Sequence, residues 1–123
     1  MTRRSRYSYP ETLAKLRQAI TEAGNTIFAT IDQAAAAGAV GLTLRPTTLI
    51  VFGNPKGGTP LMDAFPLVGL GLPLKVMVWE EDGNVNVAYE PMSEVAARYA
   101  VTGMDARIAA MDHALDGVTN AVM

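Results

Sequence analysis

The chain has 123 residues, of which half are hydrophobic, and it carries a formal net charge of −2 and no cysteine. This length is typical of one compact domain that buries roughly two-thirds of its unfolded surface. The lack of cysteine excludes disulfides and thiolate chemistry. The small negative charge excludes the broad basic field that nucleic-acid binding requires, so we expect no nucleic-acid partner.

The N-terminus is basic, with Arg3, Arg4 and Arg6 and no acidic group over residues 1–8. Short segments of this kind are most often solvated. We therefore predict a flexible basic arm over 1–8 and a single domain over 9–123. The chain also lacks the apolar core of a signal peptide and the roughly 18 apolar residues of a membrane span. We expect a cytoplasmic protein with no membrane partner.

A helix is predicted over Pro10–Ala23, because Ser8 and Glu11 have the spacing of a capping box and Gly24 follows as a stop. The β-branched residues of 26–31 then predict a strand. Asp32 ends this strand and is expected to cap a short helical turn over 34–37.

The middle of the chain predicts a short extended piece at 42–44 and a strongly buried strand over 47–52. A glycine-rich loop, Gly53 to Thr59, follows that strand. Thr59 and Pro60 form an N-cap and first-turn pair, so we expect a short helix from Pro60 to Phe65.

Two alternating runs, Leu72–Glu80 and Asn84–Tyr89, flank Asp82 and Gly83. Asp-Gly between such runs predicts a β-hairpin. The alternation places Val85, Val87 and Tyr89 on one buried side of the sheet and the asparagines on the other.

The C-terminal third is helical in pattern, with a segment that opens at Pro91 and a second helix after Gly103. Thr102 and Asp105 repeat the capping-box spacing. The last helix has an apolar stripe that covers the sheet or meets a partner subunit: Met104, Ile108, Met111, Leu115, Val118 and Val122. Together these elements predict an α+β fold, in which an antiparallel sheet of about four to five strands has helices packed on one face.

The central block carries a specific likeness to a known family through Gly53-Asn54-Pro55-Lys56, Thr59-Pro60-Leu61-Met62, Leu72-Pro73-Leu74-Lys75 and Trp79-Glu80-x-Asp82-Gly83. These residues resemble the prokaryotic family catalogued as domain of unknown function 302. The resemblance implies a small α+β layer fold of the TATA-binding-protein-like kind and a tendency to form homodimers. It implies no activity. Relatives carry a histidine directly after the aspartate that ends the second element, where this chain has Gln33, so no role of that histidine carries over.

The glycine loop is the strongest candidate for a binding site. Gly53 and Gly58 have the spacing of a P-loop, but Thr59 and Pro60 stand where the lysine and hydroxyl residue should follow. What remains is a backbone nest and a helix N-terminus, which can hold an anion, or a loop that only connects strand to helix. The residues predicted to contact a small anionic ligand are Asn54, Lys56, Gly57, Gly58 and Thr59, with Trp79 and Tyr89 as walls of the cleft.

No residue is predicted to be catalytic, and no cofactor or metal site is expected. Glu80, Glu81 and Asp82 form a solvated hairpin tip, and the single His113 lies on a helix surface. Three hypotheses remain open. The chain is a homodimeric module that binds a small molecule or anion, a structural or protein-interaction subunit that uses the last helix, or an enzyme that uses Lys56 or Glu80 with Tyr89.

Overall fold

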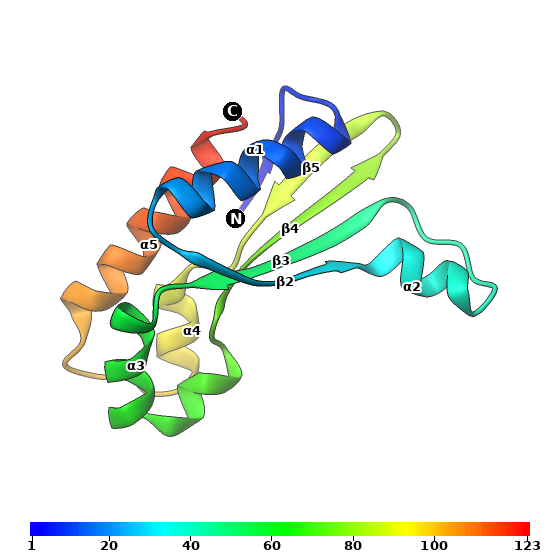
Figure 1. Ribbon diagram of the computed structural model, residues 1–123. Coiled ribbons are helices and arrows are strands. Elements are labelled where there is room, and N and C mark those ends of the chain that lie inside the picture. Colours follow the sequence, from blue (N-terminus) through cyan, green and yellow to red (C-terminus); the bar gives the residue numbers. More distant parts are fainter.

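The protein is a five-stranded antiparallel sheet with helices against one face (Figure 1). The computed structural model describes residues 1–123, and the strand order is β1-β5-β4-β3-β2. The predicted α+β class is confirmed. The strands are β1 (Thr2–Arg4), β2 (Thr26–Asp32), β3 (Thr47–Gly53), β4 (Leu74–Glu81) and β5 (Asn84–Ala88). The helices are α1 (Tyr9–Glu22), α2 (Gln33–Ala39), α3 (Pro55–Ala64), the 3₁₀ helix η1 (Pro66–Leu70), α4 (Met92–Arg98) and α5 (Asp105–Asn120).

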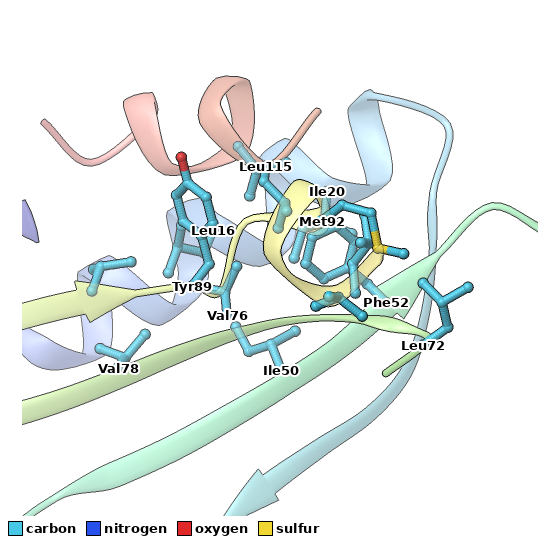
Figure 2. Packing of buried hydrophobic residues seen from close by; sticks show 14 of the residues in the cluster. Leu16, Ile20, Ile50, Phe52, Leu72, Val76, Val78, Tyr89, Met92 and Leu115 are labelled. Atoms are coloured by element: carbon cyan, nitrogen blue, oxygen red, sulfur yellow. The ribbon is translucent and has the colours of Figure 1, made fainter. Parts of the chain in front are cut away.

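The core lies between the sheet and the helices, as Figure 2 shows. Every second residue of β3 is buried, including Ile50 and Phe52, because side chains alternate between the two faces of a strand. The helices supply fully buried residues of their own, such as Leu16 and Ile20 from α1 and Leu115 from α5. One face of the sheet is therefore covered, and the other is left to solvent.

The predicted hairpin is present. Glu81 of β4 pairs with Asn84 of β5, and the two turn residues Asp82 and Gly83 have φ angles of 52° and 78°. Positive φ at both central positions is the backbone geometry that favours Asp-Gly in a two-residue hairpin loop. Val85 and Val87 face the core, as the alternation predicts.

The prediction of a flexible N-terminal arm differs from the structure, because Thr2–Arg4 forms the edge strand β1. Thr2 pairs with Ala88 of β5, and the backbone N–H of Tyr89 donates to the Met1 carbonyl at 3.1 Å. The Arg3 guanidinium donates to an Asp116 carboxylate oxygen at 2.7 Å. The basic segment is thus held by a strand and by a carboxylate of α5 that lie far away in the sequence.

The caps of α1 and α2 lie where they are predicted, although only the Ser8 half of the capping box forms at α1. The Glu11 N–H donates to Ser8 Oγ at 3.3 Å, and the Ala35 N–H donates to Asp32 Oδ1 at 2.9 Å. The expected extended piece at 42–44 forms no strand, because no other strand pairs with it. Helix α2 has no buried residue and projects beyond the strands at one end of the sheet (Figure 1).

Helix α3 begins earlier than predicted. Its N-cap is Asn54, whose Oδ1 accepts from the Lys56 N–H at 3.0 Å, and its first residue is Pro55. The pair Thr59 and Pro60 therefore lies inside the helix rather than at its start. Asn54 and Pro55 offer the same cap and first-turn proline one helical turn and a half earlier, and this longer helix still buries Leu61.

The capping box at Thr102 does not form, because Gly103, with a φ of 74°, turns the chain between Thr102 and α5. Asp112 of α5 instead caps the neighbouring helix α4, whose first N–H groups at Met92 and Ser93 donate to its two carboxylate oxygens at 2.5 and 3.2 Å. The predicted apolar stripe of α5 covers the core, since its members Leu115, Val118 and Val122 are buried.

Candidate functional site

A cavity of about 600 Å³ opens where α3 and α5 meet the end of the sheet. Its wall begins at the C-terminal end of β3 with Gly53 and continues through the start of α3. Helix α5 forms another wall, and the end of α1 with the start of β2 closes a third side. This volume lies within the range of small-molecule sites, roughly 300 to 1,000 Å³. The strand-to-helix connection that the sequence singled out therefore borders this cavity.

The wall of the cavity is mainly apolar. Its large side chains include Phe28, Met62, Leu72, Leu74 and Met111. The polar side chains of the wall are few: Asn25, Asn54, Thr59 and Arg107. Arg107 is the only charged residue among them, so any ionic contact inside the cavity involves a single positive group.

Three glycines of the wall leave room that side chains would occupy. A Cβ atom on Gly57 would lie 3.5 Å from Met111 Cε, and one on Gly58 would lie 3.7 Å from Leu72 Cδ1. A Cβ on Gly53 would lie 3.6 Å from Pro73 Cβ. All three are ordinary contact distances, so the glycines widen the cavity without being forced by steric clash.

The backbone N–H groups at the start of α3 are not free to hold an anion. The Lys56 N–H donates to Asn54 Oδ1, while the N–H groups of Gly57 and Gly58 donate to the Asn54 carbonyl at 2.9 and 3.2 Å. Pro55 has no N–H. A negative charge in this cavity would therefore have to be held by side chains.

The side chain of Arg107 reaches a backbone carbonyl of α3 that has no partner within the helix. Pro60 lacks the N–H that would bond to the carbonyl of Lys56 four residues earlier. The Arg107 guanidinium donates to this orphaned carbonyl at 3.5 Å, a long and weak hydrogen bond. Arg107 is exposed and takes part in neither of the salt bridges, which join Arg3 to Asp116 and Arg98 to Glu90. Most of its five N–H donors remain unpaired.

The structure brings together only some of the predicted site residues. Asn54, Gly57, Gly58 and Thr59 line the cavity, whereas Lys56 does not. The predicted walls Trp79 and Tyr89 lie elsewhere and on opposite sides of the sheet.

Trp79 follows the buried Val78 along β4 and so faces the uncovered side. Tyr89 lies on the covered side, next to the N-terminus, where its hydroxyl donates to Met1 Sδ at 3.2 Å. Burial raises the pKa of the Tyr89 hydroxyl above its usual value, and the nearby charge of Asp116 adds to the rise.

The groups named in the enzyme hypothesis do not converge. Glu80 pairs with Val85 near the hairpin turn, and Tyr89 lies four residues further along that chain, about 13 Å away at the rise of a strand. Lys56 lies on a separate element, the helix α3, which packs mainly against η1. No three histidine, aspartate or glutamate side chains lie together in an arrangement that could hold a metal ion.

Sequence reasoning missed the contribution of α5 to the site. Arg107, Ala110, Met111 and Ala114 all line the cavity, at spacings of three, four and seven residues from Arg107. These spacings place them on one face of a helix, which shares Met111 with the apolar stripe that packs on the core. The sequence does contain a signal for this wall, namely a positive charge followed by alanines on one helical face. Small side chains on a helical face leave space between that helix and its neighbours.

A second surface is the uncovered face of the sheet. Ile31, Leu49, Met77 and Ala88 lie in register across four adjacent strands and form one apolar row, which we call the open-face row. Ile31 and Met77 are 40% and 37% exposed. The row contains no charged side chain.

An α+β domain with a cavity at one end of its sheet is the class of protein that these observations define. The family model described as "Domain of unknown function DUF302" matches residues 1–122, and the chain belongs to this family. A crystal structure of an uncharacterized conserved DUF302 protein from Bacillus stearothermophilus is similar, with a TM-score of 0.92 and 17% sequence identity. The match covers 100% of this chain and 97% of that one, and at this identity it shows the fold alone.

The similar curated proteins are longer than this chain. Proteins named fluoride-specific ion channel FluC 1, from Brucella suis biovar 1 and from Brucella abortus biovar 1, are each 35% identical to it over 102 residues. The match covers 82% of this chain but only 40% and 38% of those proteins. No helix of the present structure has the length and apolar character needed to cross a membrane.

Proposed function

We propose that this protein is a module that binds a small molecule or anion in the cavity between α3 and α5. The observation that carries the proposal is the cavity itself: about 600 Å³, mainly apolar, with one unpaired cation in its wall. Few, well-placed polar groups in an apolar hollow are typical of small-molecule sites. Asn54, Gly57, Gly58 and Thr59 would contact the ligand. We expect the module to act in the cytoplasm, since a chain without cysteine suits a reducing compartment.

The composition of α3 supports a binding role. Two glycines and an internal proline make it a poor helix, and Leu61 is its only buried residue. A wall with so few buried contacts opens at a lower free energy than the core, and ligand-binding segments are drawn from such regions. Movement of α3 would thus widen the cavity without disturbing the sheet.

Filling the cavity tests this proposal. Ala110 and Ala109 are neighbouring exposed alanines of α5, but only Ala110 lines the cavity. In a thermal-shift screen of carboxylic acids, nucleotides and phosphate, we expect at least one compound to raise the melting temperature of the wild-type protein by several degrees. Ala109→Phe should keep this rise, and Ala110→Phe should abolish it. A rise that persists in Ala110→Phe would place the ligand elsewhere and contradict the proposal.

We further propose that two copies associate through the open-face row. The row itself is apolar, uncharged and uncovered, so a second copy can align the same row against it. The nearest charge on this face of β4 is Lys75, whose ammonium donates to the Pro73 carbonyl at 2.9 Å at the margin of the row. Val40 and Leu42 add further exposed apolar surface, at 73% and 66% exposed. They follow the projecting helix α2, which comes directly after the strand that carries Ile31. The stripe of α5 is a weaker candidate because most of it packs on the core.

The oligomeric state tests the second proposal. We expect light scattering to give a dimer for the wild-type protein and a folded monomer for Met77→Glu, since the glutamate would place a charge in the middle of the row. Leu67→Glu is the matched control, because Leu67 is 68% exposed but belongs to η1. A wild-type monomer, or a dimer that survives Met77→Glu, would refute this interface.

A further inference from the structure

We propose that the ligand of the cavity is a monocarboxylate with an elongated apolar body, whose carboxylate pairs with Arg107. This inference rests on the proposed binding function and adds the chemistry of the ligand. The guanidinium is a planar fork of N–H donors that matches the two oxygens of a carboxylate. Only one weak bond, to the Lys56 carbonyl, occupies it in the structure.

The charge of the cavity favours a single negative charge on the ligand. Arg107 is the only charged residue in the wall, and no acidic side chain there competes for it. A phosphate monoester carries a charge of about −1.5 to −2 at neutral pH, which one guanidinium does not balance. The usual protein cradle for phosphate is also missing, because the N–H groups of Lys56, Gly57 and Gly58 already donate to Asn54.

The shape of the cavity favours an elongated body. Arg107 is the first residue of α5 in the wall and Ala114 is the last. Seven residues of helix separate them, which corresponds to about 10 Å along the axis. Between them Ala110 leaves space, and Met111 and Met62 supply flexible thioether side chains that adapt to an apolar chain. The anionic head thus has one fixed position at Arg107, with apolar wall beyond it.

Titrations with matched probes test the assignment. We expect octanoate to shift the backbone amide resonances of α3 and α5 and to bind roughly 10- to 100-fold more tightly than 1-octanol, since the pair with Arg107 is a charged hydrogen bond. Acetate and inorganic phosphate should bind much more weakly than octanoate, because neither has an apolar body. Octyl phosphate should bind no more tightly than octanoate.

Variants of the arginine separate charge from shape. Arg107→Gln should reduce octanoate binding to the level of 1-octanol and leave 1-octanol binding unchanged, while Arg107→Lys should retain part of the preference. Arg45→Gln, which removes an exposed arginine outside the cavity, should behave as the wild type. Arg107 is exposed, so the variants should stay folded, as an unchanged melting temperature would show.

The outcomes distinguish the two levels of the proposal. Equal binding of octanoate and 1-octanol to the wild type, or an octanoate preference that survives Arg107→Gln, would overturn the carboxylate assignment while keeping a ligand cavity. Tighter binding of phosphate or octyl phosphate than of octanoate would do the same. If none of the probes binds and the wider thermal-shift screen of the wild-type protein also finds no compound, the binding function itself fails.

Discussion

Phe52→Ala is expected to lower the free energy of unfolding by about 3 to 5 kcal/mol, the usual loss when a buried phenylalanine is truncated in a core. Phe52 is fully buried and is the largest of the fully buried side chains. It lies on β3, which β2 and β4 flank, and it packs with residues from both the sheet and the helices (Figure 2). The surrounding elements cannot close the space that the ring leaves, so a cavity would remain.

The same loss is a large part of the stability of a small domain, which is typically about 5 to 15 kcal/mol. Urea unfolding followed by circular dichroism measures it. Phe28→Ala is the matched control, because Phe28 is 53% exposed in the wall of the cavity and its loss should cost less than about 1 kcal/mol. Equal effects of the two variants would show that the core is not centred where the structure places it.

Elements that short segments encode could be predicted from the sequence. Ser8 with Glu11 marks the start of α1, and Asp82 with Gly83 marks the hairpin, because in each case the interacting groups lie within a few residues of one another. The burial of β3 also follows from its own composition. These features are local, and the structure confirms each of them.

Elements that depend on distant partners could not be predicted in this way. Strand β1 exists because β5 and Asp116, more than 80 residues away, satisfy its backbone and its arginine. The start of α3 was ambiguous for another reason. Asn54-Pro55 and Thr59-Pro60 are two N-cap and proline pairs five residues apart. The longer helix forms with a side-chain cap from Asn54 and with Arg107 of α5 at the carbonyl that Pro60 leaves free.

The candidate site shows the same division. The segment Gly53–Thr59 can be recognised because its three glycines and its proline lie close together in the sequence, and most of it does border the cavity. The sequence pattern points to Lys56 as the charge of the site, because that lysine lies in the same segment. The tertiary fold instead places Arg107, some 50 residues further on, in the wall. A sequence pattern can locate the backbone of such a site, but it cannot show which distant helix supplies the charge.

Gly71→Ala is expected to destabilise the protein by about 1 to 3 kcal/mol through overpacking. Gly71 has a φ of −100°, so its backbone does not require glycine. The requirement is steric: a Cβ atom there would lie 2.3 Å from Val95 Cγ1 and 3.2 Å from Tyr99 Cε2. Val95 is itself only 4% exposed, so its side chain could give way only by shifting within the core. The segment after η1 would have to shift away from α4.

A double-mutant cycle shows whether this contact is the cause. Val95→Ala alone should destabilise by removing buried methyl groups, but in the Gly71→Ala background it should restore stability, because it removes the atom that clashes. The measurement is again urea unfolding of the four proteins.

Gly117→Ala is the control, since a Cβ on this glycine of α5 meets nothing within 4 Å, and it should stabilise by about 0.5 to 1 kcal/mol. If Gly71→Ala stabilised to the same degree, the close packing of α4 against the residues before β4 would be wrong. Leu72 follows Gly71 and lines the cavity, so the cavity wall at this position would then differ from the structure as well.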